Sequence, residues 1–175
     1  EENIMNKMDT SIVWQIGVVV RDVEEAAKKV QEIFGFAHQA EVGLNGTVVY
    51  DGADVTYMGQ KVDGNFKGAF YDFGSVQIEF MSPADDGPSV WKDYLKEHGP
   101  GIHHVAWKVA DNDKTQEYLE SKGLKMMQRG SWPTGSYAYY DGLESMGLII
   151  ETLEFDDERK SGEALVEKWY ERKND

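Results

Sequence analysis

Apolar positions in the first half of the chain predict a strand, a helix and a closing hairpin. Residues 12–20 form a short β-branched apolar run, which is typical of a buried strand. Asp22 follows as a helix N-cap, the next apolar side chains recur at helical spacing, and Gly35 marks the helix end. Residues 66–72 and 75–82 are strand-like runs joined by a turn. The first half therefore reads β-α-β-β-β with some extra loop.

The second half repeats this order of elements. A strand is expected over residues 102–109, and a helix over 112–122 ends at Gly123. The remaining strands are expected at 124–128, 137–141 and 148–153. An internal repeat of this kind indicates two copies of one structural unit that pack together. The sequence predicts an α+β fold in which two βαβββ modules form one cupped mixed sheet.

The segments outside the repeated strands and helices complete this organisation. Residues 37–65 carry several turn signals and predict a long loop region that shapes substrate access. Residues 89–98 predict a short helix between the modules, and the charged end of the chain predicts a C-terminal helix that packs on the body or on a partner. The predicted parts are the first module, a linker with a short helix, the second module and the C-terminal helix, at 11–83, 84–101, 102–155 and 156–175.

Composition excludes several classes of function. The 175-residue chain has a formal net charge of -14 and no cluster of Lys and Arg, which argues against nucleic acid binding. The sequence contains no run of eighteen apolar residues, so it predicts no membrane span, and no signal peptide is visible. The absence of cysteine rules out disulfides, thiolate metal sites and a cysteine nucleophile, and it fits a reducing compartment. We therefore expect a cytoplasmic protein.

Four polar residues occupy matching places in the repeat. Gln15 and His104 lie in the opening strands, seven residues before the Asp that starts each helix. Glu79 and Glu151 lie inside the apolar closing strands. If the sheet curls into a cup, the four side chains can converge, and their oxygen-rich set suits one divalent ion: Zn²⁺, Mn²⁺, Co²⁺, Ni²⁺, Fe²⁺ or Mg²⁺.

The alternative explanation for each of these residues is structural. A single acid in an apolar strand is usually near an edge or satisfied by a hydrogen bond, and a lone His beside another His is usually not a ligand. The joint pattern favours the metal site, because two carboxylates buried without a cation would be strongly unfavourable. His103 directly precedes His104, and successive side chains of a strand point to opposite faces, so we expect His103 on the opposite face in a structural or surface role.

The sequence resembles the vicinal oxygen chelate superfamily, the group of glyoxalase and methylmalonyl-CoA epimerase. The stretch from Gly99 to Trp107, which contains His103 and His104, is similar to the opening of the epimerase's second module. Residues 91–95 resemble the helix before that opening, and 147–151 match the closing strand of both relatives. The resemblance covers residues 11–155, and its motifs are specific for the superfamily rather than for a substrate.

The resemblance implies a ligand set at Gln15, Glu79, His104 and Glu151. The epimerase usually has His at the first position and Gln at the second, so this chain departs from it there. The order Gln, Glu, His, Glu instead matches some glyoxalase I enzymes, although no glutathione-binding segment is visible. The resemblance also implies a homodimer, which exposed apolar strand edges favour independently.

We therefore expect a metal-dependent isomerase or epimerase that stabilises an enolate of a small carbonyl or thioester substrate. Either Glu151 or Glu79 would be the general base, and the pair could serve both faces of one carbon. Tyr137 and Tyr139 are candidates to line the substrate pocket, against the alternative of ordinary aromatic packing. A glyoxalase-I-type lyase uses the same chemistry, and a non-catalytic binding protein of this fold is the third hypothesis. A ring-cleaving dioxygenase is disfavoured, because it needs two suitably placed His ligands.

Overall fold

The computed structural model describes residues 13–35, 47–51, 53–132 and 135–155. The strands are β1 (Val13–Val19), β2 (Thr47–Asp51), β3 (Ala53–Tyr57), β4 (Gln60–Lys61), β5 (Asn65–Asp72), β6 (Gln77–Pro83), β7 (Gly101–Lys108), β8 (Lys125–Trp132), β9 (Gly135–Asp141) and β10 (Ile149–Phe155). The helices are α1 (Val23–Phe34), α2 (Val90–His98), α3 (Asn112–Ser121) and α4 (Leu143–Met146). The predicted C-terminal helix over 156–175 lies outside the described residues.

Most of the elements predicted from the pattern are confirmed, and local chemistry explains their ends. The Asp22 carboxylate accepts hydrogen bonds from the backbone N–H groups of Glu24 and Glu25 and so caps α1, whose last turn is followed by Gly35 at a φ of 67°. Ser89 caps α2 in the same way, through the N–H of Lys92. Strand β8 is longer than predicted, and the one-turn helix α4 was not predicted.

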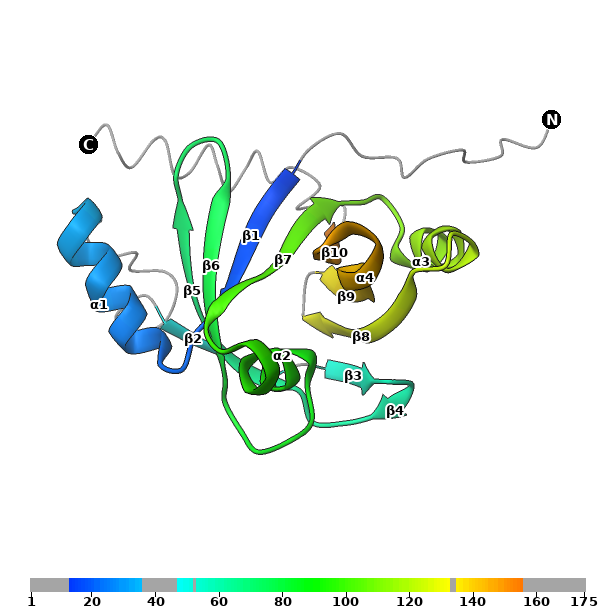
Figure 1. Cartoon of the computed structure of the whole chain (residues 1–175), viewed down its shortest axis with the longest axis horizontal. Helices are drawn as coiled ribbons and strands as arrows, with labels where there is room; N and C mark the ends of the chain where they lie inside the picture. Colours follow the sequence, from blue (N-terminus) through cyan, green and yellow to red (C-terminus); the bar gives the residue numbers. More distant parts are fainter. Residues whose placement is uncertain (1–12, 36–46, 52, 133–134, 156–175) are drawn as a thin grey trace.

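The described strands form one curved, unclosed mixed sheet (Figure 1). Their order is β2-β5-β6-β1-β7-β10-β9-β8-β3-β4. The two halves join where β1 pairs antiparallel with β7. On either side of this junction the arrangement repeats, because β1 is parallel to β6 and β7 is parallel to β10. The opening and closing strands of both halves therefore lie side by side at the centre of the sheet.

The segment expected as a long loop holds three strands, and two of them, β2 and β3, lie in different halves of the sheet, with β2 at one end and β3 next to the strand at the other end. β2 pairs with β5 at the outer edge of the first half, whereas β3 pairs with β8 in the second half. A single residue separates the two strands in the sequence, so their Cα atoms at Asp51 and Ala53 are at most about 7.6 Å apart. The chain therefore ties the two halves of the curved sheet together. Local turn signals could not predict this pairing, because it depends on a strand far away in the sequence.

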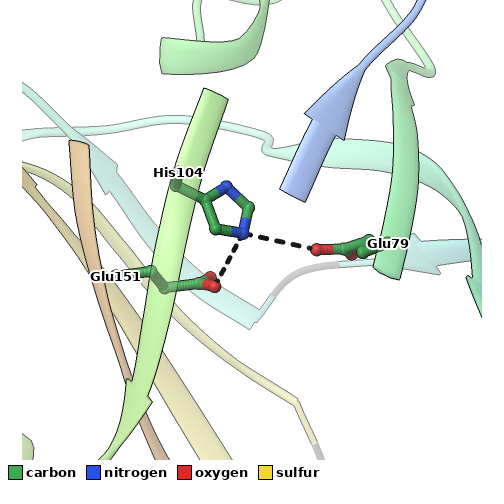
Figure 2. Close-up of side chains that lie close together, drawn as sticks. All are labelled: Glu79, His104 and Glu151. Carbon is green, nitrogen blue, oxygen red and sulfur yellow. Dashed lines mark ion pairs between the residues drawn. The ribbon is translucent and has the colours of Figure 1, made fainter. Parts of the chain in front are cut away.

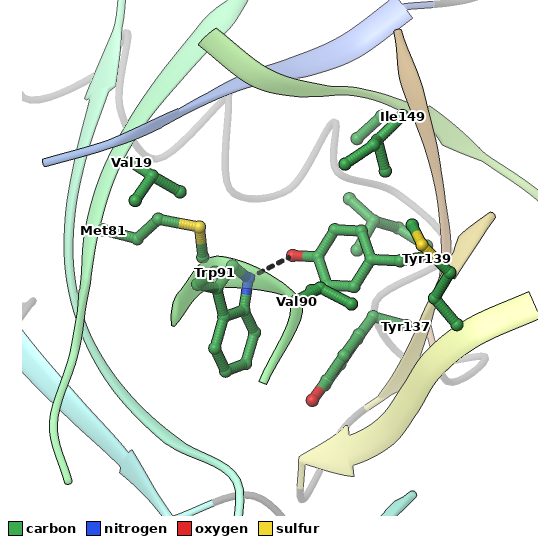
Figure 3. Packing of buried hydrophobic residues seen from close by; sticks show 10 residues of the cluster. Val19, Met81, Val90, Trp91, Tyr137, Tyr139 and Ile149 are labelled. Carbon is green, nitrogen blue, oxygen red and sulfur yellow. Dashed lines mark hydrogen bonds between the residues drawn. The ribbon is translucent and has the colours of Figure 1, made fainter. Parts of the chain in front are cut away.

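Apolar side chains fill both faces of the sheet. α1 packs on the outer face against Ala69 and Tyr71, and α3 packs on the other half's outer face near Ala138 and Tyr140. Helix α2 lies on the inner face instead, where the fully buried Trp91 packs among side chains of both halves. Figure 3 shows this inner cluster with its labelled members Val19, Met81, Val90, Trp91, Tyr137, Tyr139 and Ile149.

Candidate metal centre

The strand register places the candidate residues in neighbouring rows on the inner face of the cup. Gly17 pairs with Glu79 on one side and with His104 on the other. Glu151 pairs with Ala106, two residues beyond His104, and Gln15 shares the face of Gly17 because strand side chains alternate. The junction of the two halves therefore gathers Gln15, Glu79, His104 and Glu151.

The acidic and imidazole groups lie within coordination range of a common point. His104 Nε2 is 3.0 Å from a carboxylate oxygen of Glu151 and 3.7 Å from one of Glu79. One potential ligand atom from each of the three residues lies within 4.8 Å of the others (Figure 2). Three strands, β6, β7 and β10, supply these side chains, so the sheet itself fixes their spacing.

Gln15 completes the group through its side-chain amide. With the amide oriented for hydrogen bonding, its nitrogen donates to Glu79 at 3.1 Å and to Glu151 at 3.2 Å. The other end of the same amide lies 2.7 Å from the side chain of Gln77. With the amide reversed, its oxygen faces both carboxylates, which is the arrangement that a cation between them would favour.

The centre is almost completely shielded from solvent. Gln15 is 5% exposed, Glu79 4%, His104 0% and Glu151 3%. Burial, and then the nearby charge of Glu151, raise the pKa of Glu79 well above its ordinary value. Over the described part of the chain, neither carboxylate forms an ion pair with Lys or Arg. Two buried acids without a Lys or Arg partner favour a bound cation.

The unpaired nitrogen of His104 supports a metal at this place. His104 Nε2 has no hydrogen-bond partner, although Glu151 Oε2 is only 3.0 Å away, because this oxygen lies off the line that an N–H would follow. Figure 2 shows Nε2 turned towards both carboxylates, so it is placed to share a cation with them. Imidazole, two carboxylates and an amide fit Zn²⁺ and other divalent ions, with positions left for water or substrate oxygens.

The expectation that His103 lies on the opposite face of the strand from His104 is wrong, and its ring is not at the surface. His103 is 1% exposed, and its Nδ1 lies 2.9 Å from Nδ1 of His104, so the two rings meet. A β-bulge is the reason: Gly17 pairs with His104 and Val18 with Ile102, which leaves His103 as the extra residue. Strand alternation fails at a bulge, and the only signal in the sequence was the His pair itself.

Tyr139 and Tyr137 lie beside the centre and also pack within the core. The ring of Tyr139 is 5.1 Å from that of His104, and its hydroxyl accepts a hydrogen bond from Trp91 Nε1 at 3.3 Å. The Tyr137 hydroxyl accepts from Gln128 Nε2 at 3.2 Å. Burial raises the pKa of both hydroxyls, so both remain protonated at neutral pH.

Helix α2 covers the inner face next to this centre. Gln128 of β8 accepts a hydrogen bond from the Val90 N–H at 3.0 Å, and Tyr57 of β3 donates to Asp93. The hydrogen bond to Asp93 raises the pKa of Tyr57 to about 12. Sequence reasoning missed Gln128, since a single Gln in a strand gives no sign of its partners. Among the described helices, none is long and apolar enough to cross a membrane.

Solved structures with the same fold include methylmalonyl-CoA epimerases. The enzyme from Mycobacterium tuberculosis is 18% identical with a TM-score of 0.57, covering 90% of this chain and 96% of that one. A Streptomyces coelicolor variant in complex with 2-nitronate-propionyl-CoA is 15% identical with a TM-score of 0.57, covering 84% and 99%. An epimerase in complex with methylmalonyl-CoA and NH4+ is 16% identical with a TM-score of 0.58, covering 85% and 97%.

No curated protein matches the chain in a sequence comparison. Residues 14–140 match the sequence model of a single family, and this match spans most of the chain. The protein therefore belongs to the Glyoxalase/Bleomycin resistance protein/Dioxygenase superfamily.

Proposed function

We propose that the protein is a divalent-metal-dependent enzyme that moves a proton next to a substrate carbonyl, as an epimerase or isomerase. The buried cluster of Glu79, His104 and Glu151, with the Gln15 amide against both acids, carries this proposal. A cluster of two acids and an unpaired imidazole nitrogen is poorly suited to a purely structural role, because the two carboxylates have no Lys or Arg partner among the described residues.

The two carboxylates can perform the proton transfers. Gln15, Glu79, His104 and Glu151 would hold a divalent ion, which would supply a Lewis acid that favours negative charge on the carbonyl oxygen. Glu151 accepts the proton of the adjacent carbon, and the electron pair of the broken C–H bond moves into the carbonyl group. Glu79, which comes from the other half of the chain, returns a proton to the opposite face of that carbon. One C–H bond breaks and one forms, so the configuration inverts without any oxidant or reductant.

An acyl thioester is the substrate class that we favour. The fold is similar to that of the methylmalonyl-CoA epimerases, which supports a thioester but does not identify the acyl group. We also propose Tyr137 and Tyr139 as substrate contacts, because they lie beside the cluster and keep their hydroxyl protons.

A glyoxalase-I-type lyase is the second candidate. The order of the four side chains, Gln, Glu, His and Glu, favours it, since some glyoxalase I enzymes share that order. The substrate would then be the thiol adduct of a ketoaldehyde, and the same pair of acids would move a proton between adjacent carbons.

Metal analysis and an exchange assay test these proposals together. We expect elemental analysis of the purified protein to find about one divalent ion per chain, lost in His104→Ala. The reconstituted protein should then exchange the α-proton of a 2-methyl-branched acyl-CoA with solvent deuterium. Turnover of a hemithioacetal instead would select the lyase, and bound metal with no exchange of either substrate would favour a binding protein.

We further propose that the protein is a homodimer. Family resemblance supports this, as do the exposed side chains of Ile33, Phe34 and Phe73, which are 63%, 58% and 39% exposed at one end of α1 and the neighbouring hairpin turn. Light scattering should report twice the mass of one chain. A single-chain mass at all working concentrations would contradict the dimer. The cytoplasmic location expected from the sequence stays a prediction.

A further inference from the structure

The β-bulge in β7 brings two histidine rings into contact at the metal centre. In a regular strand His103 and His104 would point to opposite faces, but the register passes from the Gly17–His104 pair to the Val18–Ile102 pair. Both rings are consequently buried, and their Nδ1 atoms are 2.9 Å apart. This distance is a hydrogen bond, so one of the two nitrogens carries a proton and the other accepts it.

The two nitrogens of His104 then have separate partners. Nδ1 is turned to His103, and Nε2 is turned to the two carboxylates. A neutral imidazole carries a single ring proton, so an Nε2 that offers its electron pair needs the proton on Nδ1. A proton on Nδ1 of His104 has an acceptor in His103, and His103 then carries its own proton on Nε2, beside the Val90 backbone.

We propose that His103 is a positioning residue that accepts the Nδ1–H of His104 and so fixes Nε2 as an electron-pair donor between Glu79 and Glu151. The role in metal binding rests on the proposed function, whereas the hydrogen bond itself does not. The His103 ring is held in turn by the rings of Tyr94 at 5.1 Å and Tyr139 at 5.4 Å. The orientation of His104 is therefore set by a ring that is itself packed between two tyrosines.

The charge balance of the centre explains why a histidine suits this position. Metal-binding histidines commonly donate their second N–H to a carboxylate or a carbonyl. A carboxylate here would add a third acid to a buried site that already contains Glu79 and Glu151. A neutral imidazole accepts the same hydrogen bond without added negative charge.

Nitrogen NMR and metal titration of matched variants test this assignment. In the wild-type protein, a coupling across the hydrogen bond should connect the two Nδ1 nuclei, with the proton assigned to His104, both without metal and with Zn²⁺. His103→Phe keeps a ring but removes the acceptor, and it should weaken Co²⁺ binding by about 10- to 100-fold. His103→Asn places an acceptor near the lost Nδ1 and should recover most of that affinity.

Tyr94→Phe is the matched control. It removes the hydrogen bond from the Tyr94 hydroxyl to the Ile102 carbonyl at the same bulge, without touching the contact between the imidazoles. Co²⁺ affinity should therefore remain that of the wild type. An equal loss in this variant would assign the effect to general loosening of the bulge and would overturn the proposal.

The possible outcomes separate this inference from the proposed function. Co²⁺ binding by His103→Phe at wild-type affinity, or a proton assigned to His103 Nδ1, would overturn the inference while leaving the metal centre intact. If the wild-type protein binds no metal, the proposed function fails, and the coupling in the metal-free protein alone decides the hydrogen bond. If His103→Phe does not fold, the Nδ1–Nδ1 coupling in the wild-type protein and the Co²⁺ affinity of His103→Asn decide whether His103 accepts the Nδ1–H of His104.

Discussion

At the scale of single residues, Gly17 leaves the space that the imidazole of His104 occupies. A Cβ added at Gly17 would lie 1.9 Å from Cε1 and 2.2 Å from Nε2 of that ring. Both atoms belong to a side chain held between two strands, so the ring would have to leave its position. The glycine is therefore a requirement of the centre, although it carries no functional group.

The first prediction concerns Gly17→Ala. The displaced imidazole should lower metal affinity more than about tenfold, and the overpacking should reduce the free energy of unfolding by about 1–3 kcal/mol. Isothermal titration and chemical denaturation measure the two effects. Gly64→Ala is the control, because its Cβ would meet Val55 Cγ1 at 2.5 Å and strain β3, a strand that carries none of the four side chains. Unchanged metal affinity in Gly17→Ala would contradict this account of the centre.

The second prediction separates the two acids. Glu151→Gln keeps the size and one acceptor oxygen but cannot take a proton from carbon, so turnover should fall about 10²- to 10⁴-fold. Glu79→Gln should be milder, because relatives carry Gln at that place. Solvent-deuterium exchange measures both variants. If Glu151→Gln binds metal and exchanges the α-proton at the wild-type rate, Glu151 is only a ligand, and Glu79 becomes the first candidate for the base.

The third prediction is a pH dependence of the metal-free protein. The pKa of Glu79 is higher in the folded state than its ordinary value of 4.5, so the folded protein binds more protons than the unfolded one between these two values. Stability should therefore rise as the pH falls from the raised pKa of Glu79 towards 4.5. Thermal unfolding with chelator present measures this trend. Glu79→Gln should flatten it, and an unchanged slope in that variant would assign the trend to another group.

At the scale of elements, helix α2 depends on strands from both halves for its position. Trp91 of this helix packs in the inner core of the cup. Gln128 of β8 accepts a hydrogen bond from the Val90 N–H, and Tyr57 of β3 donates one to Asp93, so both hydrogen bonds join the helix to the strands. The helix shares Tyr139 with the metal centre, because the Trp91 indole donates to the hydroxyl of that tyrosine. Helix α2 of the linker therefore helps to position Tyr139, which packs against His104.

The fourth prediction tests this attachment with Gln128→Leu. The variant leaves the Val90 N–H and the Tyr137 hydroxyl without their buried partner, which should reduce the free energy of unfolding by about 1–3 kcal/mol. Gln116→Leu removes a partly buried hydrogen bond with Arg129 and should change stability by about 0.5 kcal/mol or less. Urea denaturation compares the two. Equal effects would show that the attachment of α2 adds nothing to stability.

The sequence predicted the elements best where local chemistry determines them. Asp22 and Gly35 bound α1 by capping, which depends only on neighbouring residues. The bulge in β7 could not be predicted, because it arises from the register between β7 and β1. His103 was therefore placed on the wrong face, while its neighbour His104 was placed correctly.

At the scale of the whole molecule, the repeat was enough to predict the gathering of the four side chains. Equivalent positions in two copies of one unit become neighbours when the copies pack with approximate twofold symmetry, and Gln15, Glu79, His104 and Glu151 do so. The pairing of β3 with β8 breaks that repeat. No local pattern marks it, because the choice of partner strand depends on the whole fold.

Strand β3, which follows β2 in the sequence but pairs in the second half, also constrains how the chain folds. Thr56 pairs with Arg129, 73 residues further along the chain, so β3 has no neighbour on that side until the second half is in place. A nascent first half released from the ribosome would present an unpaired edge. Contacts so distant in sequence slow folding, because the chain loses the entropy of closing a long loop before the strand pairing contributes any favourable free energy. The two halves, though copies of one unit, therefore have to reach the native state together.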